Sequence, residues 1–266
     1  MEPRKTVLVF DSGLGGLTVY REIVAARPDA DFLYVADDAA FPYGAMAERA
    51  LVARVVELIG GLIDARRPDL VVIACNTAST IALPELRRRF SLPFVGTVPA
   101  IKPACASSLT RRVSVLGTEA TIAREYTRAL IRDFAQSCRV TLVGSKRLAA
   151  FAEAELAGTP VADAAILGEI APCFCDDGER TDTVVLACTH YPLLIERLRR
   201  LEPWPVNFLD PAPAIARRVV DLLAPAPLID RTGSRRAIFT SGRPPAAVLA
   251  QFGISAEAVA TETPAV

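Results

Sequence analysis

The chain has 266 residues, 52% of them hydrophobic, which is enough for one large domain or two smaller ones with a substantial core. Its 30 basic and 30 acidic residues give a net charge of zero, and no segment forms a basic stripe, so a nucleic-acid-binding protein is not expected. No uninterrupted apolar stretch is long enough to cross a bilayer, so a membrane protein is not expected either.

The chain opens MEPRKTVLVFDSG, directly into a strand-like run, so we expect no secretion signal. The six cysteines are spread over a chain too long for a disulfide-stapled miniprotein: Cys75, Cys105, Cys138, Cys173, Cys175 and Cys188. We therefore expect reduced thiols in a cytoplasmic protein.

Short apolar runs alternate with amphipathic runs of helical length along most of the chain. The predicted strands are 6–10, 32–37, 70–75, 94–98, 113–118, 140–144, 184–188 and 206–210. The predicted helices include 17–28, 48–67, 121–137, 192–201 and 214–224. Because the strands are almost continuous in Val, Leu and Ile, they are expected to be buried on both faces, as in parallel sheets covered by helices. The pattern predicts an α/β protein with doubly wound parallel sheets.

An internal repeat divides the chain. VLVFDSGLGG from residue 7 has a counterpart in VSVLGTEATI from residue 113, and VVIACNTA at 71–78 has one in VVLACTHY at 184–191. We predict two pseudo-symmetric domains, the first formed by 1–98 together with 210–266 and the second by 99–209. The last segment is too short for a third domain and is expected to complete the first.

Polar side chains follow the predicted strands where each one ends. In parallel α/β sheets this edge holds the ligand. The residues there are Asp11, Ser12, Asp37, Cys75, Asn76, Thr77, Thr118, Cys188, Thr189 and His190. If the two halves face each other, these groups are expected to converge on one crevice.

Cys75 and Cys188 occupy equivalent positions in the two halves. A single free cysteine is usually a small buried hydrophobe, and we expect this of the other four. A thiol at a strand end, beside the amides of a following helix, can be held as a thiolate and serve as a base or nucleophile. His190, the only histidine, could assist such a thiol or deliver a proton, and so could Asp11 or Glu153.

The glycine-rich stretch DSGLGGLTV at 11–19 has two possible structural interpretations. Its amides could bind a small carboxylate, or the glycines could simply allow a tight turn. It matches neither a dinucleotide fingerprint nor a P-loop. One histidine and a lone Cys173-Phe174-Cys175 are too few for a zinc site, so no metal is expected.

In six stretches the sequence resembles the glutamate racemase family, the cofactor-independent enzymes that supply D-glutamate for bacterial peptidoglycan. They are FDSGLGGLTV, the segment from Asp37 to FPYG, VVIACNTAS, GTVPAIKPA, GTEATI and LACTHYPLL, with FTSG near 239 resembling one subgroup. The resemblance implies two flavodoxin-like α/β domains related by a pseudo-two-fold axis, with glutamate bound between them. The family is commonly dimeric, so we expect a homodimer.

The resemblance also implies roles for individual residues. Cys75 would handle the α-proton of D-glutamate and Cys188 that of L-glutamate, with Asp11, His190 and Glu153 assisting. The implied substrate-binding positions are Asp11, Ser12, Tyr43, Gly44, Asn76, Thr77, Thr118, Thr121, Thr189 and His190.

The chemistry of racemisation explains why the Ala-Cys strand end occurs twice. A racemase removes a proton from one face of a carbon and returns one to the other, which calls for two acid/base groups. A pyridoxal enzyme would need a Schiff-base lysine, and none of Lys5, Lys102 and Lys146 follows a strand beside these motifs, so no cofactor is expected. Three alternatives stay open: an aspartate racemase, a binding module for a small dicarboxylate, and a hydrolase using Cys188 with His190.

Overall fold

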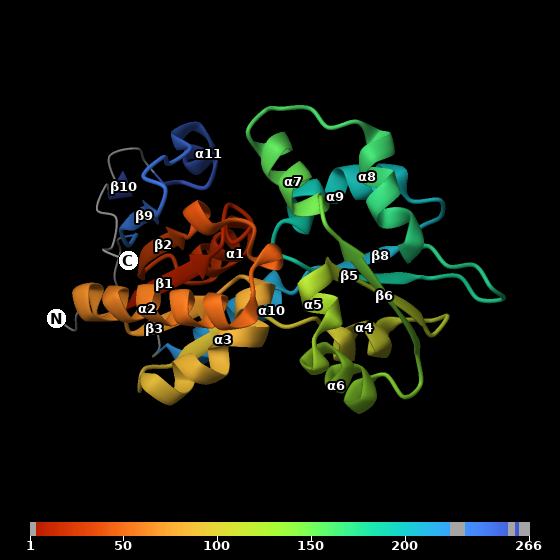
Figure 1. Ribbon diagram of the computed structural model, residues 1–266, viewed down its shortest axis with the longest axis horizontal. Coiled ribbons are helices and arrows are strands. Elements are labelled where there is room, and N and C mark those ends of the chain that lie inside the picture. Colours follow the sequence, from red (N-terminus) through yellow and green to blue (C-terminus); the bar gives the residue numbers. More distant parts are fainter. Residues whose placement is uncertain (1–3, 224–231, 255–258, 261–266) are drawn as a thin grey trace. The chain divides into compact units, whose positions relative to one another are not determined.

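The computed structural model describes residues 4–223, 232–254 and 259–260. The chain divides into two compact units, Met1–Thr97 with Ala212–Val266, and Val98–Pro211. Each unit contains one sheet whose described strands all run parallel (Figure 1).

The sheet of the first unit has the strand order β10-β9-β2-β1-β3-β4. Its strands are β1 (Thr6–Asp11), β2 (Asp31–Ala36), β3 (Leu70–Ile73), β4 (Phe94–Gly96), β9 (Arg235–Phe239) and β10 (Val259–Ala260). Its helices are α1 (Leu17–Ala26), α2 (Glu48–Arg66), α3 (Asn76–Arg89), α10 (Ala212–Leu222) and α11 (Ala246–Gln251), with short 3-10 turns η1 (Asp38–Ala40) and η2 (Tyr43–Ala45).

Helices cover both faces of this sheet. On one face, Leu33 of β2 belongs to a buried cluster with Ile59 of α2 and Leu86 of α3. On the other, the Tyr20 ring of α1 packs edge-on against Phe32 and Tyr34 of the same strand, with centroids 5.8 and 5.9 Å away. Successive strand residues point to opposite faces, so β2 is buried from both sides. The predicted α/β class is confirmed.

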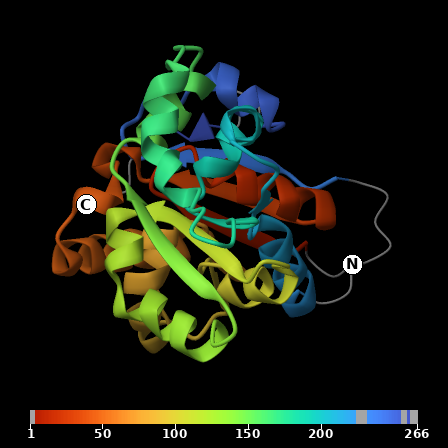
Figure 2. The ribbon, with the colours of Figure 1, turned by 90° about the vertical axis from the view of Figure 1, so that its right-hand side faces the viewer.

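The sheet of the second unit has the order β6-β5-β7-β8. Its strands are β5 (Arg112–Thr118), β6 (Arg139–Ser145), β7 (Thr183–Ala187) and β8 (Asn207–Leu209). Its helices are α4 (Ile101–Ser107), α5 (Glu119–Ala123), α6 (Glu125–Phe134), α7 (Leu148–Leu156), α8 (Asp163–Ile170) and α9 (Ile195–Leu201), with 3-10 turns η3 (Ala171–Cys173) and η4 (Tyr191–Leu194). Helices α7 and α8 lie on one side of β5 and β6, and α4 and α6 lie on the other (Figures 1 and 2).

The internal repeat of the sequence corresponds to a repeat of topology. In the first sheet the first four strands are ordered β2-β1-β3-β4, and in the second the next four are ordered β6-β5-β7-β8. The strands that precede Cys75 and Cys188, β3 and β7, therefore hold the same place in their sheets, each paired with the first strand of its half.

Two predicted helices differ from those observed. The helix predicted over 121–137 is two helices, because Arg124 adopts an extended conformation (ψ 139°) between α5 and α6. The helix predicted over 192–201 begins as the 3-10 turn η4 before α9 follows. For the helix predicted over 214–224, residue 224 lies outside the described residues. Among those described, no helix has the length and apolarity to cross a membrane.

The core of the first unit predicts a large effect for truncation at Ile59, which is fully buried on α2. Ile59→Ala should lower the free energy of unfolding by about 2–5 kcal/mol, because it removes buried methylene groups and leaves a cavity. The exposed Glu57 on the same helix is a matched control, and Glu57→Ala should change the value by less than about 0.5 kcal/mol. Urea unfolding followed by circular dichroism measures both; equal effects would contradict the assigned orientation of α2.

Candidate active site

In the first unit, two candidate residues lie together at the carboxyl edge of the sheet. Asp11 ends β1, and Cys75 follows β3 by two residues. The two strands pair directly, and the amide of Ala74 continues the ladder by donating to the Phe10 carbonyl at 2.8 Å. Parallel pairing thus delivers Asp11 and Cys75 to neighbouring positions, both buried.

Cys75 is the N-cap of α3. Its Sγ accepts a hydrogen bond from the Ala78 amide at 3.5 Å and lies 3.7 Å from the Ser12 hydroxyl. The first turn of a helix has unpaired amides and a partial positive charge, which favour an anion at this position. The Ala78 amide and the helix N-terminus therefore make this position suitable for an anionic sulfur.

The glycine turn at 13–16 is shaped around Asp11. The Gly13 amide donates to the Asp11 carboxylate at 3.0 Å, and the Tyr34 hydroxyl holds the Gly13 carbonyl at 2.6 Å. A Cβ on Gly16 would lie 2.5 Å from the Cβ of Asp11, so this position has no room for any other residue. At least one amide of the turn is thus used to fix Asp11.

Asn76 opens α3 beside Cys75 and is buried. Neither its side-chain oxygen nor its side-chain nitrogen has a hydrogen-bond partner within the described residues. Buried amides are normally paired, so this side chain is available to a ligand that supplies both a donor and an acceptor. Thr77, next in the helix, is buried with it.

A buried carboxylate, Asp37, organises the segment that carries Tyr43 and Gly44. It accepts hydrogen bonds from the Tyr43 hydroxyl at 2.5 Å, from Arg54 through two nitrogens at 2.6 Å each, and from Thr240 at 2.7 Å. Burial by itself would raise the pKa of Asp37, but these donors outweigh it and the pKa is lowered. Burial, together with the Asp37 charge, raises the pKa of Tyr43, so its phenol stays protonated.

Sequence reasoning missed Arg54 and Thr240. Arg54 lies in a helix whose pattern predicts only an apolar core face, and Thr240 is about 200 residues from Asp37. FTSG at 239–242 resembles one subgroup of the family, and nothing in the sequence links it to Asp37. Strand β9 ends at Phe239, the first of these residues, and pairs with β2 just before Asp37.

In the second unit, Cys188, His190 and Glu153 form a chain of contacts. The Cys188 sulfur lies 3.7 Å from Nδ1 of His190, and Nε2 of His190 lies 2.9 Å from Oε1 of Glu153. His190 is buried, whereas the Glu153 side chain on α7 is 23% exposed. A carboxylate at one ring nitrogen orients the other toward the sulfur. Thr189, between the cysteine and the histidine, is also buried.

Thr118 and Thr121 lie where β5 meets α5. The Thr118 hydroxyl caps α5 by accepting from the Thr121 amide at 3.1 Å, and the two hydroxyls are 2.9 Å apart. They occupy the carboxyl end of β5, the strand that pairs with β7 ahead of Cys188.

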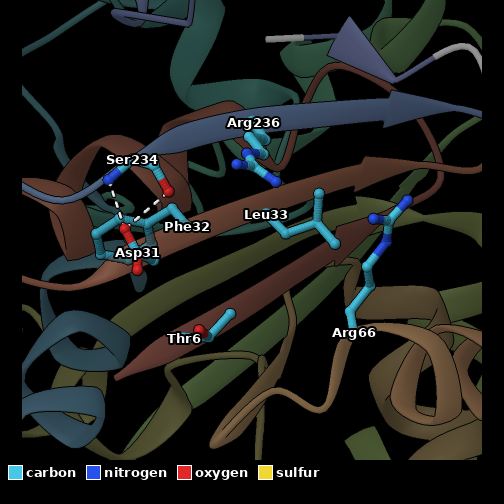
Figure 3. A pocket seen from close by; sticks show the side chains of 7 residues that line it. All are labelled: Thr6, Asp31, Phe32, Leu33, Arg66, Ser234 and Arg236. Carbon is cyan, nitrogen blue, oxygen red and sulfur yellow. Dashed lines mark hydrogen bonds between the residues drawn. The ribbon is translucent and has the colours of Figure 1, made fainter. Parts of the chain in front are cut away.

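A separate pocket in the first unit has about 230 Å³ and lies at the opposite end of the strands (Figure 3). Its lining includes Thr6, which opens β1, and Asp31, which opens β2 and accepts two hydrogen bonds from Ser234. Strands of this length place it roughly 15–20 Å from Asp11. It is not part of the candidate site. Among the described residues, no cluster of His, Cys, Asp and Glu is suited to a metal ion.

Comparison with known proteins identifies the class. The profile of the Asp/Glu/hydantoin racemase family matches residues 7–219. The glutamate racemase of Brucella canis is 54% identical over 250 residues, 92% of this chain and 90% of that protein. The glutamate racemase of Brucella anthropi is 57% identical over 226 residues, covering 84% and 81%.

The crystal structure of Escherichia coli glutamate racemase, in complex with L-glutamate and the activator UDP-MurNAc-Ala, matches with a TM-score of 0.86. It is 41% identical, and the match covers 95% of this chain and 96% of that one. The chain belongs to the Asp/Glu/hydantoin racemase family. The resemblance found in the sequence is confirmed, and the chain is an isomerase of the glutamate racemase class.

The Asp37 network predicts a pH-dependent effect of Arg54→Met. Losing the guanidinium leaves a buried carboxylate short of partners, so the free energy of unfolding at pH 7 should fall by about 3 kcal/mol. Because the folded pKa of Asp37 is lowered, its stabilisation is present above the ordinary value of 3.8 and lost as the pH falls below it.

The gap between wild type and Arg54→Met should therefore be constant from pH 7 to 5 and shrink below about pH 4. Urea unfolding across this range measures it, with Arg54→Lys as a variant that keeps the charge but loses the two-pronged contact. A gap that widened on acidification would refute the assigned ion pair.

Proposed function

We propose that this protein interconverts L- and D-glutamate without a cofactor, using Cys75 and Cys188 as the two bases. Cys75 exchanges a proton with the α-carbon of D-glutamate and Cys188 with that of L-glutamate. The observation that carries the proposal is the duplication itself: each half has a thiol after the equivalent strand, β3 or β7, and each thiol has a proton-handling or hydrogen-bonding neighbour.

Each turnover needs one thiolate and one thiol. On the Cys75 side, the Ala78 amide stabilises the thiolate, and Ser12 and Asp11 lie beside it. On the Cys188 side, His190 takes or returns the proton at Nδ1, while Glu153 holds Nε2. The two sides therefore reach the same chemistry with different assisting groups.

The α-proton of an amino acid is weakly acidic, and no electron sink is supplied by this chain. The negative charge that develops must be stabilised by donors that are already in place and by exclusion of water. Asn76, whose amide is buried and has no partner in the described residues, is proposed as one such donor to the substrate. The hydroxyls and amides of Ser12, Tyr43, Gly44, Thr77, Thr118, Thr121 and Thr189 complete the proposed substrate-binding set.

We propose that the product serves peptidoglycan synthesis in the bacterial cytoplasm and that the enzyme is a homodimer. Support for the first comes from the bacterial glutamate racemases to which the chain is similar. The homodimer is an expectation from the family resemblance.

Replacing either thiol tests the proposal directly. Cys75→Ala and Cys188→Ala should each lower racemisation in both directions by at least about 10³-fold, because each direction uses both groups. The buried Cys173, which lies outside the proposed site, is a matched control, and Cys173→Ala should retain activity. Circular dichroism checks the fold. Near-wild-type racemisation by either site variant would rule out two thiol bases.

The Glu153–His190 contact gives a subtler prediction. Glu153→Gln keeps the shape but loses the charge that holds His190, so kcat should fall about 10-fold or more with a smaller change in KM. The pH profile of kcat should shift as well, which a purely structural role would not cause. Glu155, on the same helix but paired with Arg197, is the control: Glu155→Gln should leave the pH profile unchanged.

A further inference from the structure

A hollow in the second unit lies at the amino ends of β5 and β6. It has a volume of about 440 Å³, and three of its lining side chains are arginines, Arg111, Arg112 and Arg139. Arg112 and Arg139 are the paired first residues of their two strands. Thr118 ends β5 six residues further on, roughly 20 Å away. The hollow is therefore separate from the residues proposed for racemisation.

The buried side chain of Arg112 has fewer hydrogen-bond acceptors around it than its guanidinium has donors. Its side chain is only 7% exposed, and Nη2 lies 2.8 Å from a carboxylate oxygen of Asp177. Its Nε and Nη1 have no hydrogen-bond partner in the described part of the chain. The Cys175 thiol interacts with this guanidinium, but sulfur is a weak acceptor. Buried guanidinium N–H groups are normally paired, and leaving them unpaired is unfavourable.

The protein supplies little negative charge to offset these arginines. Asp177 is 54% exposed and shared, since it also lies 3.1 Å from Nη1 of Arg139. It comes from a tight turn at Gly178 (φ +104°), which also exposes Glu179 to the hollow. Arg111 donates to a neutral acceptor, the carbonyl of Cys105.

The neighbouring acids do not change this balance. Asp182 is held by the Ser108 hydroxyl and the amides of residues 109 and 110, and Asp176 is paired with Arg180. Three guanidinium groups therefore face two exposed carboxylates, which leaves a net positive charge in the hollow.

We propose that this hollow binds an anion that carries a phosphate group. A phosphate has three acceptor oxygens and about −1.5 to −2 charges near neutral pH, so it can pair with Arg112 and Arg139 together. The unpaired Nε and Nη1 of Arg112 lie on different edges of the guanidinium plane, so each can donate a hydrogen bond to a phosphate oxygen. The Ser137 hydroxyl lines the same hollow and can donate a further bond.

Isothermal titration calorimetry tests the site at constant ionic strength, with an equilibrated glutamate mixture present to occupy the racemase site. The titrants are inorganic phosphate, glycerol phosphate and acetate. Wild type should bind both phosphates more tightly than acetate, and the tighter of the two phosphates shows whether the ligand is free or organic phosphate.

Two variants and a control locate the binding. Arg112→Gln should abolish it, and the exposed Arg139→Gln should weaken it at least about 10-fold without altering the racemisation rate. Arg199, exposed on α9 and paired with Glu196, is the matched control: Arg199→Gln should bind like wild type. Arg139→Gln keeps the test informative if Arg112→Gln fails to fold.

No phosphate binding by wild type at millimolar concentration would overturn the proposal. So would equal binding of acetate, or unchanged affinity in Arg139→Gln. Racemisation measured without phosphate on the same preparations is independent, so failure of this site and failure of the proposed function are distinguishable.

Discussion

The parallel pairing of β1 with β3, and of β5 with β7, fixes where the candidate site residues lie. In a parallel sheet all carboxyl ends lie at one edge, so residues that follow different strands become neighbours whatever their separation in sequence. Asp11 and Cys75 are brought together in this way across 64 positions, and Cys188 follows β7, beside the strand that carries Thr118. The buried Val, Leu and Ile of the strands hold this register, because slipping by one residue would exchange the two faces.

The surroundings of each thiol depend on the element that follows its strand. Cys75 caps a helix, and its sulfur receives a backbone amide, whereas Cys188 is followed by a 3-10 turn that positions His190. Equivalent thiols therefore sit in unlike surroundings.

Much of this could be predicted from the sequence, for definite physical reasons. Continuous apolar runs marked the eight predicted strands because parallel strands are buried on both faces, and the repeated Ala-Cys ends marked the thiols. The interruption of the helix at Arg124 was not predicted, because the helical pattern of 121–137 continues through this residue without Gly or Pro. Arg54 and Thr240 were missed for another reason: their partner Asp37 is reached only through tertiary contacts, which no local pattern encodes. Glu153 was a loose match in sequence, and its 2.9 Å contact with His190 supports the role proposed for it.

The central claim is that two different thiols act on the α-carbon. The most direct measurement is proton NMR of L-glutamate, and separately of D-glutamate, with the purified protein in D₂O and no added cofactor. Two bases predict that, early in the reaction, deuterium appears in the product enantiomer while recovered substrate keeps its α-proton, from either starting enantiomer. If substrate and product acquired deuterium equally fast, a single base would serve both faces and the account would be wrong.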